Sequence, residues 1–289
     1  MKIILFSRPQ PLRSAEELQK LIDAIEHNGF DYSVNEEFAE MIERVLGRSV
    51  PAENRYGYTI GKQPAECVMV CYGGDGTLLE GIHRLDGAPV PVVGINSGHL
   101  GFLATAPKDR IDLIFKDIRE GNLKIEQRTM LALEGLSDGK TRYALNEVAI
   151  QRLDATMINI EAHIDGQMTA AYFGNGVILS TPTGSTAYSL SAGGPIVTPA
   201  CNCLVLSPLT PHNLTMRPLV IPDSSTVRFE VDTRHRSASV SLDNRTYEIE
   251  GNTTLTVRRA ERVVFLAVPH NISFYDTLRN KMMWGVDVR

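Results

Sequence analysis

The sequence lacks any long apolar segment. No window approaches the roughly 18 apolar residues of a transmembrane helix, and the apolar run Ile3–Phe6 is too short for the core of a signal peptide. Both absences predict a cytoplasmic protein with no membrane partner.

The chain also has few cysteines and no net positive charge. The four cysteines (Cys67, Cys71, Cys201 and Cys203) lack the paired C-x2-C spacing of a zinc site, and so few cysteines do not make a disulfide scaffold. We therefore expect reduced thiols. A net charge of −5 argues against a nucleic-acid binder that works by neutralising phosphates. It still permits a nucleotide site, which needs only local positive potential and directed backbone N–H groups.

The first part of the chain alternates strand-like and helix-like patterns. Short apolar runs at Lys2–Phe6, Cys67–Tyr72 and Pro91–Ile95 are typical of buried strands. Helices are predicted from a capping box at Ser14 and Glu17 up to Gly29, and from Pro107 up to Gly121. This alternation predicts an α/β domain with a Rossmann-like parallel sheet.

After about residue 122 the helical period fades and short strand-like segments follow one another. Thr226–Asp232 alternates between apolar and polar residues, and Val263–Val268 is a continuous apolar run. We predict an α/β domain over residues 1–121 and an all-β, sandwich-like domain over 122–269. The pattern leaves open that residues 270–289 form a short helix that packs back on the first domain.

A glycine-rich loop at Gly73–Thr77 follows one of the predicted strands. Glycines let a backbone approach a ligand closely, and a helix N-terminus favours anions. Thr77 and Glu80 predict a capping box for the helix that follows. Asp75 would repel phosphate unless it accepts a proton, holds a metal, or accepts hydrogen bonds from backbone N–H groups within a tight turn. These alternatives remain open at this point.

Four further segments carry polar residues in dense runs. Gly94–Leu103 follows another buried strand and forms a second loop at the same sheet edge. Asn146 and Glu147 interrupt the strand-like run Tyr143–Ile150, where polar residues are costly unless they are paired. Thr181–Ile196 is rich in hydroxyl groups and glycine, and Pro211–Pro218 is a loop that contains His212.

Taken together and in order, these segments resemble the NAD kinase family of the bacterial type. The resemblance rests on G-G-D-G-T, G-I-N-x-G-x-L-G-F-L, Asn-Glu, T-P-T-G-S-T-A-Y with S-A-G-G-P, and P-H-x-L-x-x-R-P. It covers most of residues 67–222. G-G-D-G-T alone is shared with diacylglycerol-type lipid kinases and is similar to a phosphofructokinase loop, whereas the full set is specific.

The resemblance implies a kinase that transfers the γ-phosphoryl of ATP, or of polyphosphate, to the 2′-hydroxyl of the adenosine ribose of NAD. It also implies a phosphofructokinase-like first domain, a site between the two domains, a divalent cation expected to be Mg²⁺, and a homodimer or homotetramer. The metal ligands stay unassigned.

The resemblance also implies roles for individual residues. Asp75 is the expected general base. The expected NAD-binding residues are Asp75, Gly76, Phe102, Asn146, Glu147, Thr156, Asn175, Thr183, Thr186, Ala187, Tyr188 and Ser191. The residues expected on the phosphate or donor side are Gly73, Gly74, Thr77, His212 and Arg245.

Two positions depart from the family's pattern. Asn175 stands where many members have an aspartate facing the nicotinamide, and Arg245 stands near a position where relatives tend to have glycine or glutamine. Two rival hypotheses remain: a lipid kinase, which would need an apolar groove, and a catalytically silent dinucleotide sensor, which Asn175 favours.

Overall fold

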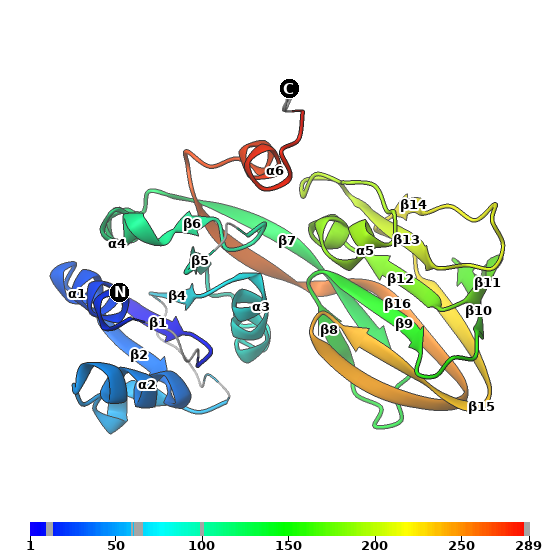
Figure 1. The fold of residues 1–289 in the computed structure, drawn as a ribbon, viewed down its shortest axis with the longest axis horizontal. Coiled ribbons are helices and arrows are strands. Elements are labelled where there is room, and N and C mark those ends of the chain that lie inside the picture. Colours follow the sequence, from blue (N-terminus) through cyan, green and yellow to red (C-terminus); the bar gives the residue numbers. More distant parts are fainter. Residues whose placement is uncertain (10–13, 59, 61–65, 99–100, 286–289) are drawn as a thin grey trace. The chain divides into compact units, whose positions relative to one another are not determined.

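The computed structural model describes residues 1–9, 14–58, 60, 66–98 and 101–285, without the side chains of 234–236. It divides into two compact units, Met1–Gln127 with Val264–Arg289, and Arg128–Val263 (Figure 1). The domain boundaries predicted from the sequence, at residues 121 and 269, remain predictions, and this division into compact units is a separate description. His99 and Leu100 of the second loop lie outside the described residues.

The first unit, hereafter the α/β unit, contains a parallel sheet. Its strands are β1 (Lys2–Phe6), β2 (Asp31–Asn35), β3 (Arg55–Tyr56), β4 (Cys67–Tyr72), β5 (Val92–Asn96) and β6 (Ala106–Pro107). They run in the order β3-β2-β1-β4-β5, with β6 beside β5, and every pairing is parallel. Its helical elements are α1 (Ala15–His27), α2 (Glu36–Leu46), η1 (Ala52–Asn54), α3 (Asp75–Arg84), η2 (Lys108–Arg110), α4 (Ile111–Glu120) and α6 (Phe274–Met282).

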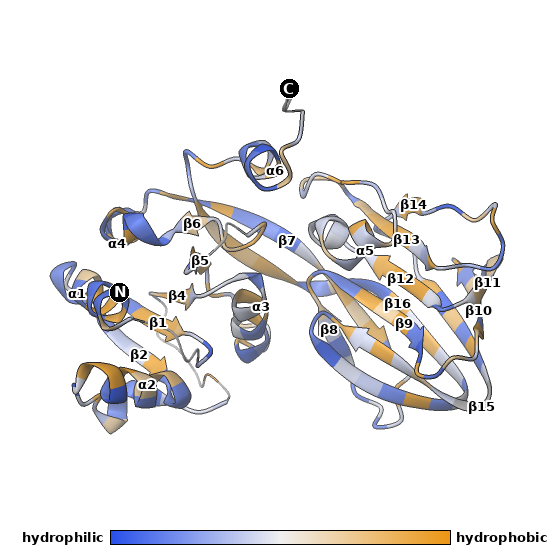
Figure 2. Cartoon of the chain, in the orientation of Figure 1, coloured by the Kyte–Doolittle hydropathy of each residue, from blue (hydrophilic) through white to orange (hydrophobic). Residues whose placement is uncertain are grey.

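Helices pack on both faces of this sheet. Alternate residues of a strand point to opposite faces, so each strand contributes side chains to both packing layers. Ile3 and Leu5 belong to the apolar core shared with α1, α2 and α4. On the other face, a Cβ at Gly81 of α3 would lie 3.0 Å from the Met69 side chain and 3.2 Å from that of Phe6. A doubly covered parallel sheet explains the near-continuous apolar strands of the sequence, and β1 is coloured mainly as hydrophobic in Figure 2.

The local signals behaved as predicted at two helices. The Ser14 side chain accepts the backbone N–H of Glu17 at the start of α1, and Gly121 ends α4 in the left-handed conformation. Pro107 precedes η2, and α4 itself begins only at Ile111. Among the described residues, no helix has the length and apolar character needed to cross a bilayer.

The second unit, hereafter the β-rich unit, is built from antiparallel strands. They are β7 (Leu123–Glu134), β8 (Arg142–Ala144), β9 (Glu147–Arg152), β10 (Ile158–Ile164), β11 (Gln167–Gly174), β12 (Gly176–Ser180), β13 (Cys203–Leu209), β14 (Leu219–Pro222), β15 (Val227–Leu242) and β16 (Arg245–Pro269). Two short helices follow β12, namely η3 (Thr183–Thr186) and α5 (Tyr188–Ser191).

The long strand β15 pairs with different strands along its length. Its first half pairs with β10 and its second half with β9, and the register shifts between Asp232 and Ser237. Val227, Phe229 and Val231 face one core and are at most 2% exposed. The predicted fold class, a parallel α/β domain followed by a β-rich domain, is confirmed.

Strand β16 has partners in both units. Its first part pairs with β15, and Leu266 near its end pairs in parallel with Val92 of β5. The chain then turns into α6, which belongs to the α/β unit. The end of the chain therefore contributes to the unit that contains the glycine loop.

Candidate active site

The glycine loop joins β4 to α3 at the carboxyl edge of the parallel sheet. Gly74 is the N-cap and Asp75 is the first helical residue. Glycine is required at position 73, because a Cβ there would lie 2.4 Å from Thr77 Oγ1. The predicted capping box of Thr77 and Glu80 is wrong. The N-cap is Gly74, three residues earlier, and Thr77 is buried within the first turn of the helix.

The carboxylate of Asp75 is held by the second loop. Its Oδ2 accepts the backbone N–H of Phe102 at 2.9 Å, and its Oδ1 accepts those of Leu103 at 3.1 Å and Ala104 at 2.9 Å. A Cβ at Gly101 would lie 1.9 Å from Oδ1, so the neighbouring loop needs glycine there. An ionised carboxylate has about four acceptor positions, and Oδ2 therefore keeps one that no backbone N–H of the described residues fills.

Two cations lie beside this loop. Lys281 of α6 places its ammonium 3.9 Å from Asp75 Oδ2 and 4.7 Å from the centre of the Phe102 ring. The Arg8 guanidinium approaches Gly76, where a Cβ would lie 3.4 Å from Nη1, and pairs with Glu80 at 3.4 Å. The loop thus combines glycines, a helix N-terminus and positive charge, which together suit an anion.

In the β-rich unit, Asn146 and Glu147 do not sit inside one continuous strand as predicted. Strand β8 ends at Ala144 and β9 begins at Glu147, so Asn146 lies in the break between them. Asp243 causes this break, because its carboxylate accepts the N–H groups of Leu145, Asn146 and Glu147 at 2.9, 2.7 and 3.3 Å. Those amides are therefore turned away from a partner strand.

Both polar side chains at this break are buried and offer acceptors. Asn146 and Glu147 are each 7% exposed. Asn146 Oδ1 and Glu147 Oε2 have no hydrogen-bond partner among the described residues. Buried acceptors without partners are costly, so the pair suits a ligand that brings hydroxyl or amino groups.

The Glu147 side chain is held as a neutral acid near pH 7. Burial raises its pKa to about 8, the negative charge of Asp243 adds to this, and the backbone N–H of Tyr188 opposes it. A neutral carboxyl can donate one hydrogen bond and accept others. Glu147 can therefore bind both a donor and an acceptor of a ligand.

The hydroxyl-rich segment after β12 packs directly on this break. Thr181 donates its hydroxyl to Leu145 O at 2.6 Å, and a Cβ at Gly184 would lie 2.1 Å from Asn146 O. Arg128 Nη1 donates a long hydrogen bond of 3.5 Å to Oγ1 of the buried Thr183. Thr186 and Ala187 are half-buried, and Tyr188 and Ser191 are exposed.

The remaining predicted site residues are distributed more widely in the β-rich unit. Thr156 lies in the β9–β10 turn, where its N–H bonds Asp154. Asn175 is half-buried between β11 and β12, and exposed His212 stacks edge-on against Phe173 at 6.0 Å. Arg245 is half-buried and donates to Tyr143 O at 2.8 Å, so it connects β16 to β8.

The structure therefore forms two separate groups of predicted residues. Gly73, Gly74, Asp75, Gly76, Thr77 and Phe102 come together in the α/β unit. Asn146, Glu147, Thr183, Thr186, Ala187, Tyr188 and Ser191 come together in the β-rich unit. Sequence reasoning missed Lys281, Arg8, Gly101 and the clamp by Asp243. The Asp243-Asn244 turn pattern was the only local signal for that clamp.

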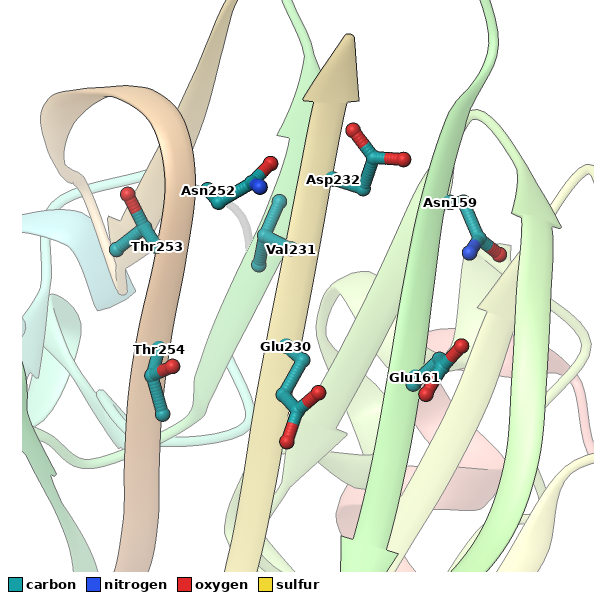
Figure 3. A pocket seen from close by; sticks show the side chains of 8 residues that line it. All are labelled: Asn159, Glu161, Glu230, Val231, Asp232, Asn252, Thr253 and Thr254. Atoms are coloured by element: carbon teal, nitrogen blue, oxygen red, sulfur yellow. The ribbon is translucent and has the colours of Figure 1, made fainter.

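A hollow on the outer face of β10, β15 and β16 contains none of these residues. It is lined by Asn159, Glu161, Glu230, Val231, Asp232, Asn252, Thr253 and Thr254 (Figure 3). Ligand atoms of Glu161, His163 and Glu230 lie within 4.8 Å of one another, and Arg228 also pairs with Glu230. Because Arg228 already neutralises part of this charge, we interpret the face as an ion-paired sheet surface.

Comparison with known proteins gives consistent results for both units. The ATP-NAD kinase N-terminal domain matches residues 3–123, and the ATP-NAD kinase C-terminal domain matches residues 145–268. Curated proteins named NAD kinase are similar along the chain. That of Cytophaga hutchinsonii is 34% identical over the whole of both chains, and that of Porphyromonas gingivalis is 40% identical over 76% of this chain and 77% of its own.

Two solved structures share the fold. Yeast NADH kinase in complex with NADH has a TM-score of 0.85 at 24% identity, covering 100% of this chain and 89% of that one. An NAD kinase from Archaeoglobus fulgidus in complex with ATP has a TM-score of 0.74 at 21% identity, with 98% of each chain covered.

Proposed function

The chain belongs to the ATP-NAD kinase family, and from this premise we propose how its residues phosphorylate NAD. The reaction is the ATP-dependent conversion of NAD to NADP. We propose that the acceptor is the 2′-hydroxyl of the adenosine ribose, that the donor is ATP or polyphosphate, and that the enzyme acts as a homodimer or homotetramer in the cytoplasm.

The observation that carries the mechanism is the carboxylate of Asp75. Three backbone N–H groups hold it in place, and Oδ2 keeps one unused acceptor position. In our proposal the 2′-hydroxyl donates its hydrogen bond to that position. The hydroxyl oxygen then bonds to the γ-phosphorus, the bond from this phosphorus to the bridging oxygen of ADP breaks, and Asp75 takes the proton.

The three backbone N–H groups that bond to the Asp75 carboxylate fix the position of its oxygens. Beyond the proton transfer to Asp75, we expect most of the rate to come from orientation and electrostatics. We propose that the N–H groups of Gly73 to Thr77 face the donor phosphates, and that Phe102 lies against the adenine.

The β-rich unit supplies the proposed binding groups for NAD. The unpartnered Asn146 Oδ1 and Glu147 Oε2 suit the amino and hydroxyl groups of adenosine. The other residues proposed for NAD are Gly76, Thr156, Asn175, Thr183, Thr186, Ala187, Tyr188 and Ser191. His212 and Arg245 are proposed for the phosphates, although the bond from Arg245 to Tyr143 O leaves only part of its guanidinium for a ligand.

The family implies a divalent metal, and we propose Mg²⁺. This ion usually takes one or two carboxylates together with substrate phosphates and water. No group of three His, Cys, Asp or Glu ligands that includes Asp75 exists among the described residues. The residues thus fit a metal carried mainly by the donor phosphates, where it would neutralise charge on the leaving diphosphate, and they do not form a protein cage.

The test is NADP formation by the purified protein with NAD, ATP and Mg²⁺, read through an NADP-specific dehydrogenase. We expect turnover that depends on both substrates and on the metal. Measurable NAD binding without turnover, with either ATP or polyphosphate, would contradict the proposal and support a dinucleotide sensor.

A further inference from the structure

The last helix of the chain presents one face to the glycine loop. Residues at positions i, i+4 and i+7 of a helix lie on the same face. Phe274, Leu278 and Lys281 of α6 have this spacing, so they share a face. A full capping box of Ser273 and Asp276 defines where this helix begins. On this face Leu278 is 6% exposed and Phe274 is half-buried, whereas Tyr275, Arg279 and Asn280 on the rest of the helix are exposed.

Aromatic contacts anchor this face beside Asp75. The Phe274 ring lies 6.3 Å from the Phe102 ring, and the Lys281 ammonium lies 4.7 Å from the centre of the same ring. Phe102 also donates its backbone N–H to Asp75 Oδ2. One residue of the second loop therefore links the helix, the ammonium and the carboxylate.

Holding the helix does not explain Lys281. Its ammonium is 3.9 Å from Asp75 Oδ2, at the outer limit of an ion pair, and the two side chains are 37% and 29% exposed. Ion pairs with this much exposure contribute little to stability. Phe274 and the buried Leu278 and Thr277 already anchor α6. The partly exposed ammonium of Lys281 therefore remains available to a ligand beside Asp75.

We propose that Lys281 is a catalytic residue whose ammonium binds the phosphoryl group during transfer. The inference rests on the proposed function. The attacking hydroxyl must lie about 2.6–3.2 Å from Oδ2 to give up its proton, and the phosphorus bonds to that same hydroxyl oxygen. Lys281 approaches the same oxygen of Asp75, so the phosphoryl oxygens come within its reach.

The chemistry of the step favours a cation at this position. Negative charge is spread over the three equatorial oxygens of the transferred phosphoryl, and a positioned positive side chain stabilises that charge. The proton of the hydroxyl still goes to Asp75 and the electron pair of the broken bond leaves with ADP. Lys281 contributes hydrogen bonds and charge only, and is not consumed.

The test compares Lys281→Met with Lys281→Arg, and uses Arg279→Met as a matched control on the same helix. Arg279 pairs with Asp276 on the exposed side. We expect Lys281→Met to lower kcat by about 10²–10³-fold, with KM for NAD and the NAD dissociation constant within about threefold. Lys281→Arg should restore at least tenfold of the loss, and Arg279→Met should behave as wild type.

Each alternative outcome separates this inference from the proposed function. An active wild type whose Lys281→Met variant keeps kcat within threefold would overturn the role of Lys281 alone. A rise in KM for NAD that accounts for the whole loss would also overturn it, because that indicates ground-state binding. If Lys281→Met does not fold, Lys281→Gln replaces it under the same criteria. A wild type that binds NAD without turnover would overturn both proposals.

Discussion

Two aspartates, one in each unit, use the same backbone device. Asp75 accepts three consecutive N–H groups from residues 102–104, and Asp243 accepts three from residues 145–147. Their neighbours differ. Asp75 Oδ2 faces the Lys281 ammonium, whereas Asp243 lies beside the buried carboxyl of Glu147.

We infer from this difference that three backbone hydrogen bonds alone do not make a carboxylate a catalytic group. The three backbone N–H groups, hereafter the amide cradle, determine where the carboxylate oxygens lie. The charge beside the oxygens determines whether they suit proton transfer or only positioning. A cation beside an oxygen with an unused acceptor position suits a reaction at that oxygen. A second carboxyl beside the oxygens suits a positioning role, in which Asp243 shapes the break between β8 and β9. Burial raises the pKa of Glu147, and the charge of Asp243 adds to this rise.

The variants Asp75→Asn and Asp243→Asn should differ most in their effect on kcat. We expect Asp75→Asn to lower kcat by roughly 10²–10⁴-fold, because the variant cannot accept the proton. Asp243→Asn should lower kcat less than tenfold. Initial rates with NAD and ATP measure both. Equal losses of kcat in the two variants would mean that the two cradles do not differ in function.

Gly101 tests the cradle of Asp75 without altering the carboxylate. A Cβ at Gly101 would lie 1.9 Å from Oδ1, so Gly101→Ala must displace the side chain, and we expect kcat to fall by about 10–10²-fold. The matched control is Gly98→Ala in the same loop, where a Cβ would meet nothing within 4 Å among the described residues. If both variants retain wild-type kcat, the position of Asp75 is not critical.

Asp243→Gly tests the second cradle by removing the acceptors of three amides. Glycine tolerates the backbone of this residue, whose φ is +53°, so the change isolates the side chain. We expect the free energy of unfolding to fall by about 2–4 kcal/mol. KM for NAD should rise about tenfold, because Asn146 and Glu147 lose their alignment. Urea unfolding and initial rates measure these effects, and an unchanged KM would contradict the positioning role.

Glu147 should make the free energy of unfolding depend on pH. Its pKa rises from an ordinary 4.5 to about 8 on folding, so the folded state holds a proton that the unfolded state has lost between these values. Its stabilising contribution is complete below pH 4.5 and is lost as pH rises to about 8. The slope is about 1.4 kcal/mol per pH unit. Unfolding of Glu147→Gln should lack this slope, and a wild-type slope in that variant would contradict the assignment.

Asn175→Asp adds a third carboxylate, at a position with a different environment. The backbone N–H of Asn175 donates to Leu209 O, and its side chain is half-buried. The expected effect is the smallest, a twofold to fivefold lower KM for NAD with no change for NADH, because only the oxidised nicotinamide is cationic. Parallel titrations with NAD and NADH at two salt concentrations measure it, and equal changes for both would contradict the charge argument.

Local residue patterns were sufficient for the elements and for the positions of the loops. The apolar runs became buried parallel strands, Ser14 capped its helix, and the glycine loop lies between β4 and α3. The prediction failed where a distant residue competes for the backbone. The strand expected through Asn146 is broken because Asp243 takes its amides, and the cap expected at Thr77 moved to Gly74.

Residue types and their neighbours along the chain were sufficient to predict the family, the order of the elements and the chemistry available in each loop. The folded chain was needed to learn which oxygen of Asp75 keeps an unused acceptor position, that Lys281 lies beside it, and that the charge of Asp243 acts on Glu147. These facts depend on strand register and on where the last helix packs. Register and packing are set by contacts between residues far apart in the chain, which no local pattern records.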